Sequence, residues 1–372
     1  MLIFLISTVF ATPTLSGQTC ATLEQLAIAP PAVRQEDLPV LHKNGKQERD
    51  AVCASCSNEL YSDNFVVKWG SGVSQNEAQN ILTAMEVAWD SEINDLGYLP
   101  PVGTDQYYFN VYIGDTGSGT PDGYGAAGYF TQDSEGFPMI VIAKTTAQSE
   151  YLDMTAAHEF FHAIQGRAAR YDYDPTGPSA WFWEATANWA EGRVYPGTSN
   201  MAGFLMGYAF FPHYPVNYFN YPDSGSLDEF HQYGAFIFPL HITEIEADDS
   251  VIWNAWNDSG SDSDPMEVMD GYLREYGTTI NESWLNHIAH MSVWDYALGS
   301  DYEYYIDYYQ QYYPEGENRI ARTVQQQGSA GWRSGPSDLE PQRYGHNTIL
   351  AKSLSLSEAS FGIRGAELGT MG

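Results

Sequence analysis

Residues 157–163 read A-H-E-F-F-H-A and contain the motif H-E-x-x-H. Two histidines four residues apart lie one above the other on an α-helix, so both imidazoles can reach one metal ion. The glutamate between them then faces a water molecule bound to that metal. The motif predicts a metal-hydrolase site with His158 and His162 as ligands and Glu159 as the proton-transfer group.

The residues around the motif predict a helix with one apolar side. Its apolar positions on a helical wheel are Leu152, Ala156, Phe160, Ala163 and Ile164. His158 and His162 fall on nearly the opposite side of the wheel. The alternative, histidines satisfied inside a packed core, would place them within the apolar stripe. We therefore expect both histidines to face a site and to lie outside the core.

Zinc hydrolases need a third protein ligand that leaves the fourth position open for water. Glu184 is the candidate, because it lies on a second predicted helix, Pro178 to Glu191, which Gly192 is expected to end. Asn188, one turn later, is expected to hydrogen-bond a ligand histidine. The alternative for Glu184 is a solvated helix face. Tryptophan neighbours in the sequence count against it, because an unpaired carboxylate among them would be costly.

With these residues the sequence resembles the gluzincin metallopeptidases, whose third zinc ligand is a glutamate on a second helix downstream of H-E-x-x-H. The resemblance is closest to secreted bacterial metalloproteases with an H-E-F-F-H-A-I-Q core and a W-x-x-E-A-x-A-x-W helix. These are His158 to Gln165 and Trp181 to Trp189 here, and the similarity extends from about Asn64 to Tyr344. Many gluzincins have aspartate where this chain has Asn188, so the partner of the ligand histidine would be neutral.

The resemblance implies an α+β, zincin-like metalloprotease fold, with an N-terminal mixed β-sheet and helices followed by a mainly helical C-terminal subdomain. It also implies one catalytic Zn²⁺, with Glu159 as general base. The oxyanion donor is expected within His231-Gln232-Tyr233-Gly234. Tyr233 is preferred and His231 is the second candidate. The alternative for Tyr233 is a core tyrosine at a helix start.

The favoured function is therefore a secreted, zinc-dependent endopeptidase that acts on proteins or peptides. A zinc aminopeptidase is an alternative, although no amine-binding glutamate motif is evident. The motif is also compatible with a metal-bearing hydrolase of another class, and with a non-catalytic secreted adhesin or binding module on a zincin scaffold. The intact Glu159 counts against the binding module.

The amino-acid composition limits the classes of partner that the protein can bind. The 372 residues include 48 acidic and 16 basic side chains, which gives a net charge of -32. Nucleic acid and anionic membranes would be repelled. Residues 2–10 form an apolar run followed by small residues, which is typical of a signal peptide and favours secretion, or export to a periplasm. No other stretch approaches the length of a membrane span. We expect a monomer.

Four regions are predicted along the chain. Residues 1–17 are the signal peptide, 18–62 a pro-like or wrapping segment without periodicity, and 63–335 the catalytic domain. Residues 336–372 read as the start of a β-rich C-terminal domain that is cut short, or as an end that folds back. Among Cys20, Cys53 and Cys56, one disulfide and one remaining thiol are expected. The alternative is a latency thiolate that caps the catalytic zinc.

Further elements follow from periodicity, capping and turn residues. The predicted strands are Phe65 to Trp69, Tyr107 to Ile113, Met139 to Ala143 and a weaker Ala127 to Thr131, which is a candidate edge for substrate pairing or merely a hairpin arm. The predicted helices run from a Ser74 capping box to Leu96, from Tyr233 to Ile245 with a kink at Pro239, from Met266 to Tyr276 and from Trp284 to Leu298. The run Asp258 to Asp264 is a weak Ca²⁺ candidate, and a solvated turn is favoured there.

Overall fold

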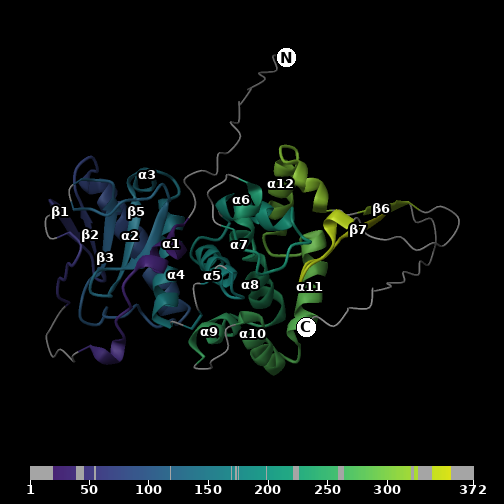
Figure 1. Ribbon diagram of the computed structural model, residues 1–372, viewed down its shortest axis with the longest axis horizontal. Coiled ribbons are helices and arrows are strands. Elements are labelled where there is room, and N and C mark those ends of the chain that lie inside the picture. Colours follow the sequence, from purple (N-terminus) through teal and green to yellow (C-terminus); the bar gives the residue numbers. More distant parts are fainter. Residues whose placement is uncertain are drawn as a thin grey trace, which may run out of the picture.

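The computed structural model describes residues 20–38, 46–53, 56–117, 119–168, 170–171, 174, 176–197, 199–220, 226–258, 264–319, 322–325 and 337–352. The expected signal peptide and the middle of the candidate Ca²⁺ run lie outside these residues. Figure 1 shows a sheet half on the left, which holds the earlier part of the chain, and a helical half on the right. The protein is therefore α+β, with the mixed sheet N-terminal and the helices C-terminal, as expected.

The sheet half contains one mixed, 5-stranded sheet of order β1-β2-β3-β5-β4. Its strands are β1 Asn58–Tyr61, β2 Phe65–Trp69, β3 Phe109–Gly114, β4 Gly128–Gln132 and β5 Pro138–Ala143. The inner strands β2, β3 and β5 run parallel, and β1 and β4 pair antiparallel on the two edges. The inner strands are almost continuously apolar because both faces of a parallel sheet are covered.

The weakest predicted strand is an edge strand. β4 begins one residue later than expected and pairs with β5 through Gly128 and Ile142, while its other side is free of the sheet. It is both the outer strand and one arm of a hairpin, so the two interpretations of this segment are compatible. An edge strand presents unpaired backbone N–H and C=O groups to another segment.

Helices cover the sheet and carry the motif. The Ser74 capping box begins α2, Gln75–Trp89, which continues as a π-turn over Asp90–Asp95. The short α3, Lys144–Ala147, leads into α4, Leu152–Ala168, which holds the H-E-x-x-H motif. Phe160 of α4 packs edge-on against Phe65 of β2, with ring centroids 5.4 Å apart. The apolar stripe predicted for α4 therefore faces the sheet and α2.

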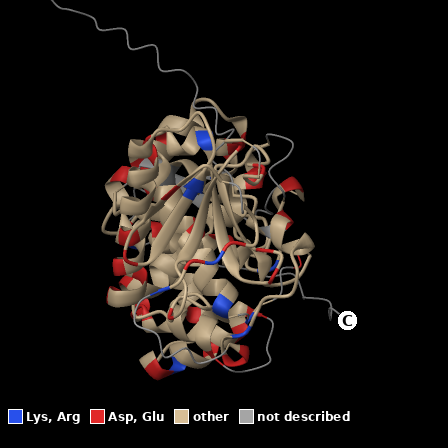
Figure 2. Cartoon of the chain, turned by 90° about the vertical axis from the view of Figure 1, so that its left-hand side faces the viewer, with Lys and Arg blue, Asp and Glu red and all other residues tan. Residues whose placement is uncertain are grey.

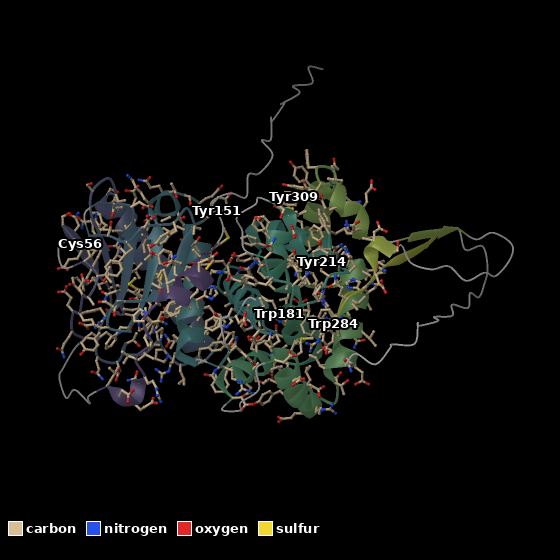
Figure 3. The ribbon with its side chains drawn as sticks, viewed as in Figure 1. Cys56, Tyr151, Trp181, Tyr214, Trp284 and Tyr309 are labelled. Atoms are coloured by element: carbon tan, nitrogen blue, oxygen red, sulfur yellow. A yellow bond between two sulfur atoms is a disulfide. The ribbon has the colours of Figure 1, made fainter. Side chains whose placement is uncertain are left out.

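The helical half is built around α5, Ala180–Val194. It also contains α6 Ser199–Ala209, α7 His231–Gly234, α8 Ile237–His241, α9 Ser250–Asn257, α10 Pro265–Leu273, α11 Ile280–Val293 and α12 Gly299–Gln310. Its interior is rich in aromatic side chains, and Figure 3 shows Trp181 and Trp284 within it. None of the helices that the structure describes is long and apolar enough to cross a bilayer.

Three helix predictions are corrected. Gly192 does not end α5, which continues to Val194 because Gly192 keeps a helical conformation there. The single helix expected from Tyr233 is divided into α7, α8 and a π-turn at Ile242–Glu246. Pro239 cannot donate to the carbonyl of Ala235, so the chain breaks and places Pro239 in the first turn of α8. Helix α11 begins at Ile280 and stops where Trp294 turns left-handed, with φ 54°.

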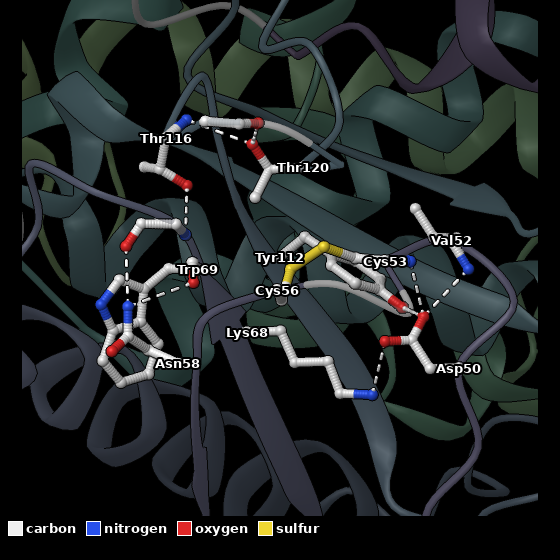
Figure 4. The surroundings of a disulfide bond; sticks show 12 residues. Asp50, Val52, Cys53, Cys56, Asn58, Lys68, Trp69, Tyr112, Thr116 and Thr120 are labelled. Atoms are coloured by element: carbon white, nitrogen blue, oxygen red, sulfur yellow. Dashed lines mark hydrogen bonds and ion pairs between the residues drawn. A yellow bond between two sulfur atoms is a disulfide. The ribbon is translucent and has the colours of Figure 1, made fainter.

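Residues 18–62 were expected to lack periodic structure, but several of them form regular elements. The segment contains α1 Thr22–Ile28, a 3₁₀ turn at Gln35–Asp37 and β1. Cys53 and Cys56 form the expected single disulfide, and Cys20 is the free thiol. Beside the disulfide, the buried Lys68 pairs with Asp50 at 2.9 Å (Figure 4), which attaches this segment to β2. The part of this segment from Asp50 to Tyr61 is therefore attached to the sheet.

The end of the described chain returns to the helical half. Strands β6 Arg322–Gln325 and β7 Ile349–Lys352 form a small parallel pair. Between them, the His346 amide donates to the carbonyl of Pro212 at 2.6 Å, and Val216 donates to Arg343. Of the two expectations for this region, the described residues fold back. Figure 2 shows the sheet side of the molecule, where acidic residues prevail over basic ones.

Candidate metal centre

Helix α4 brings the two histidines of the motif together. The Nε2 atoms of His158 and His162 lie 3.1 Å apart, and the rings meet edge-to-face. Both residues lie off the apolar stripe, as the wheel predicts, yet both are buried, with 6% and 0% of their surface exposed. The expectation that they lie outside the core is thus wrong about burial. Helix α5 packs over the polar side of α4 and encloses it.

Helix α5 supplies the third group. Glu184 Oε2 lies 3.2 Å from His158 Nε2 and 3.5 Å from His162 Nε2. Zinc bonds of about 2.0–2.2 Å to nitrogen and oxygen require ligand atoms roughly 3.3 Å apart at the corners of a tetrahedron. The three observed separations scatter around that value. The three residues therefore fit a divalent metal ion with bond lengths like those of zinc. The donor set is common to several such metals.

The charges at the centre favour a cation. Burial would lower the pKa of His158, but the hydrogen bond and charge of Glu184, with Glu159 and Glu191, raise it to about 9. Burial would raise the pKa of Glu184, but the two histidines lower it to about 2. The buried carboxylate and imidazoles thus favour positive charge at this position, which a metal ion can supply.

A cysteine completes the cluster. Cys20 Sγ and one ligand atom each from His158, His162 and Glu184 all lie within 4.8 Å of one another. Burial, with the charges of Glu159 and Glu184, raises the pKa of the Cys20 thiol well above its ordinary value. The sequence points to a thiol at the metal only as an alternative, because nothing local to Cys20 specifies that location.

Glu159 lies beside the cluster and is hydrogen-bonded to Cys20 and Thr22. It accepts hydrogen bonds from Thr22 Oγ1 at 2.9 Å and from Cys20 Sγ at 3.4 Å. Burial raises its pKa above the ordinary range. Strand β4 passes close by, since a Cβ added to Gly128 would lie 3.1 Å from Glu159 Cγ. The carboxylate is therefore next to both the candidate metal position and the edge strand.

Gln165 orients one ligand histidine. Its Nε2 donates to the carbonyl of Trp183 at 3.0 Å and to Thr186 Oγ1 at 2.9 Å, so its Oε1 faces His162 Nδ1 at 2.6 Å. That oxygen can only accept, so Nδ1 carries the proton and Nε2 is left with its lone pair toward the centre. Sequence reasoning missed this role, although Gln165 stands three residues after His162.

A carboxylate approaches the other ligand histidine. Glu191 Oε2 lies 3.9 Å from His158 Nδ1, and burial, partly offset by His158, raises the pKa of Glu191 to about 7. This is the position expected for Asn188. Asn188 instead donates from Nδ2 to the carbonyl of Tyr233 at 3.1 Å and ties α5 to α7. The spacing along the polar face of α5, where Glu191 follows Glu184 by seven residues, was the available signal.

The two candidate oxyanion donors, Tyr233 and His231, lie in different surroundings. The Tyr233 ring lies 6.1 Å from that of His158, and its hydroxyl oxygen is 3.3 Å from the Cys20 amide nitrogen. His231 packs against Tyr208 and Tyr218, and burial lowers its pKa to about 3. The structure thus brings Tyr233 to the cluster, whereas His231 packs within a separate group of aromatic side chains.

These features define an α+β protein with a buried candidate metal centre between two helices, next to the edge of a mixed sheet. The chain belongs to a family of unknown function (DUF6055), and the model of that family matches residues 23–364. Among curated proteins, none matches the chain. The family match includes every member of the cluster except Cys20, which lies just before it.

Proposed function

We propose that the protein is a secreted zinc-dependent endopeptidase with a zincin-like catalytic half. The observation that carries this proposal is the pairing of three converging ligand atoms with a buried carboxylate beside them. His158, His162 and Glu184 would hold the metal. Glu159, on the helix that carries the two histidines, accepts hydrogen bonds from Thr22 and Cys20. A structural metal site has no need of that additional carboxylate, whereas hydrolysis requires a base there.

The residues divide the chemistry among them. When bound, Zn²⁺ would lower the pKa of a bound water molecule and polarise a substrate carbonyl. Glu159 takes the proton from the attacking water and returns it to the leaving amine. The Tyr233 hydroxyl donates to the oxyanion that develops. Gln165 holds the imidazole of His162 in place through its Nδ1 atom, and Glu191 places a carboxylate 3.9 Å from Nδ1 of His158.

The edge strand supports a peptide as the substrate. The outer edge of β4 lies beside Glu159, and the chain's own Cys20 already pairs there with Gly128. An extended peptide that took the place of Cys20 would pair with the same edge and lay a carbonyl against the centre. Pairing along a strand does not depend on a free terminus, and this favours internal cleavage over aminopeptidase action. The disulfide between Cys53 and Cys56 is consistent with export, because such bonds persist in oxidising compartments.

A second candidate function is a structural metal site. The four buried side chains of the cluster could close the coordination sphere completely, which is typical of structural zinc. In that case the chain would bind zinc tightly and would have no hydrolytic activity in any variant.

Metal content and cleavage test the proposal together. Purified protein, and a Cys20→Ala variant, are analysed for bound metal and assayed with a peptide blocked at both ends. We expect one zinc per chain and cleavage by at least one of the two proteins, abolished by a chelator. Adding Glu159→Gln should remove cleavage and leave the metal bound, because Glu159 transfers a proton and is not a ligand. Zinc binding without cleavage by either protein would contradict the proposal.

A further inference from the structure

We infer that residues Cys20 to Thr22 form a built-in inhibitor of the metal centre, with Cys20 Sγ as the fourth metal ligand. This inference rests on the proposed function and names its regulation. It is supported by contacts to each part of the site: the ligand cluster, the general base, the substrate edge and the oxyanion donor.

The first contact is at the metal position. A catalytic zinc site keeps one coordination position for water, whereas Cys20 Sγ lies within 4.8 Å of the three other ligand atoms. A thiolate is among the strongest ligands for zinc. Cys20 is also the one cysteine that the disulfide leaves free, so its sulfur is available as a ligand.

The second contact occupies the general base. Thr22 Oγ1 donates to Glu159 Oε2 at 2.9 Å and accepts from the Phe130 amide of β4 at 2.7 Å. One hydroxyl thus links the base to the edge strand, in the space where the attacking water would have to lie. A carboxylate oxygen that accepts this bond is less available to take a proton from water.

The third contact occupies the substrate edge. Cys20 forms a parallel bridge with Gly128, and the Ala21 amide donates to the Gly128 carbonyl at 3.2 Å. Helix α1 then continues along β4, and Figure 1 shows it at the side of the sheet that faces the helical half. The backbone groups that would pair with a peptide substrate are therefore already in use.

The fourth contact engages the oxyanion donor. The Tyr233 hydroxyl lies 3.3 Å from the Cys20 amide nitrogen and 3.4 Å from its carbonyl oxygen. The backbone of Cys20 thus stands where the carbonyl of a substrate would approach. A structural ligand needs only its sulfur at the metal, whereas here Thr22, Ala21 and the Cys20 backbone also contact the general base, the edge strand and Tyr233.

The exchange that switches the site is a ligand substitution. With a metal bound, inhibition would form the bond from Cys20 Sγ to the metal, release a bound water molecule and pass the thiol proton to solvent. Activation would reverse these steps, with water entering as Cys20 to Thr22 leave and the thiolate taking up a proton. Removal of the segment or covalent modification of Cys20 would make activation permanent.

Cobalt-loaded protein provides the direct test. Co²⁺ replaces zinc, and a thiolate bound to it gives a sulfur-to-cobalt charge-transfer absorption in the near ultraviolet. We expect this band in the wild-type protein and in a Cys53→Ala/Cys56→Ala control, and its loss in Cys20→Ala. Each protein should keep one metal per chain. With zinc, Cys20→Ala should cleave the blocked peptide at least roughly tenfold faster than wild type.

The outcomes separate the two proposals. Absence of the band in wild-type protein would overturn the inference without any variant having to fold. Loss of metal in Cys20→Ala would overturn it in favour of a structural site. Equal cleavage by wild type and Cys20→Ala would show that Cys20 does not inhibit the centre, while the proposed endopeptidase activity would still be supported. Failure of both to cleave, with metal bound, would remove the proposed function itself. Thr22→Val, which leaves every ligand in place, should also raise the rate.

Discussion

At the scale of single residues, the centre depends on groups that orient the ligands. Gln165 is fixed by two acceptors, the Trp183 carbonyl and the Thr186 hydroxyl, before it meets His162. This leaves only its oxygen for the imidazole and determines which nitrogen faces the centre. Glu191 approaches the other imidazole from α5. Neither side chain is part of the ligand cluster, yet Gln165 decides where the lone pair of His162 points and Glu191 adds negative charge beside His158.

The first prediction concerns Gln165. Gln165→Ala should weaken zinc binding roughly 10–100-fold, because His162 loses the partner that holds its tautomer and ring orientation. Competition with a chromophoric chelator measures this change. Gln79→Ala, at an exposed position of α2, is the matched control and should leave the affinity unchanged. Equal affinities of the Gln165→Ala and wild-type proteins would show that His162 needs no such support.

The second prediction concerns Tyr233. In the Cys20→Ala background, Tyr233→Phe should lower kcat by roughly ten- to a thousandfold, because the hydroxyl bond strengthens only as negative charge develops. KM for a small peptide and the zinc content should hardly change. His231→Gln is the control, since His231 lies in the aromatic group and away from the cluster. Loss of kcat in the control alone would transfer the donor role to the histidine.

At the scale of elements, the function depends on how closely β4 approaches α4. Gly128 makes this approach possible, since an added Cβ would lie 3.1 Å from Glu159 Cγ, Thr155 Cγ2 and the Val141 carbonyl oxygen. The same glycine pairs with Cys20 on its outer side. If the proposed function is right, a strand that is one methyl group further from the helix would carry a substrate away from Glu159. The edge strand β4 and the motif helix α4 are therefore packed as one unit.

The third prediction tests that approach. Gly128→Ala should destabilise the protein by about 1–3 kcal/mol, because a well-packed contact has to open. It should also lower kcat/KM by displacing the edge strand. Gly271→Ala in α10 is the control, where a Cβ meets nothing within 4 Å and the change should stabilise the helix. Urea unfolding of both variants measures the difference, and equal stability would contradict the tight approach.

At the scale of the whole molecule, the helical half buries several neutral histidines. Burial is the first cause of the lowered pKa of His231, to about 3, and of His241 and His346, to about 4. An unfolded chain binds a proton at each of these residues below about pH 6.5, whereas the folded chain does not. Acid therefore favours unfolding through these groups, and their contribution to stability rises with pH across this window.

The fourth prediction uses this linkage at His231. Between pH 8 and pH 5 the unfolded state gains a proton at His231, which costs the wild-type fold about 2 kcal/mol at 1.36 kcal/mol per pKa unit. The glutamine of His231→Gln does not titrate, so the stability of the variant has no dependence on pH through this position. The destabilisation caused by the variant should therefore shrink by about 2 kcal/mol as the pH falls from about 8 to about 5. A difference that is independent of pH, measured by urea unfolding, would show that His231 has the same pKa in the folded and unfolded chains, which would contradict the prediction.

The sequence alone determined the features that repeat at short range. Helical periodicity places His158 and His162 on one side of α4, and a carboxylate at Glu184 follows from the second motif. The capping box of α2 and the strands β2, β3 and β5 were likewise predicted within one or two residues. These features depend on neighbours within a turn or a strand, so local spacing is sufficient to find them.

The tertiary structure alone decided which distant groups share the site. Cys20 reaches Glu159 across 139 positions of the chain, and no local pattern encodes that contact. The burial of both histidines, the exchange of Asn188 for Glu191 as the neighbour of His158, and the choice between Tyr233 and His231 depend on how α5 and α7 pack against α4. Packing angles and chain crossings arise from the whole core. A side chain's partner across such an interface follows only once the core has formed.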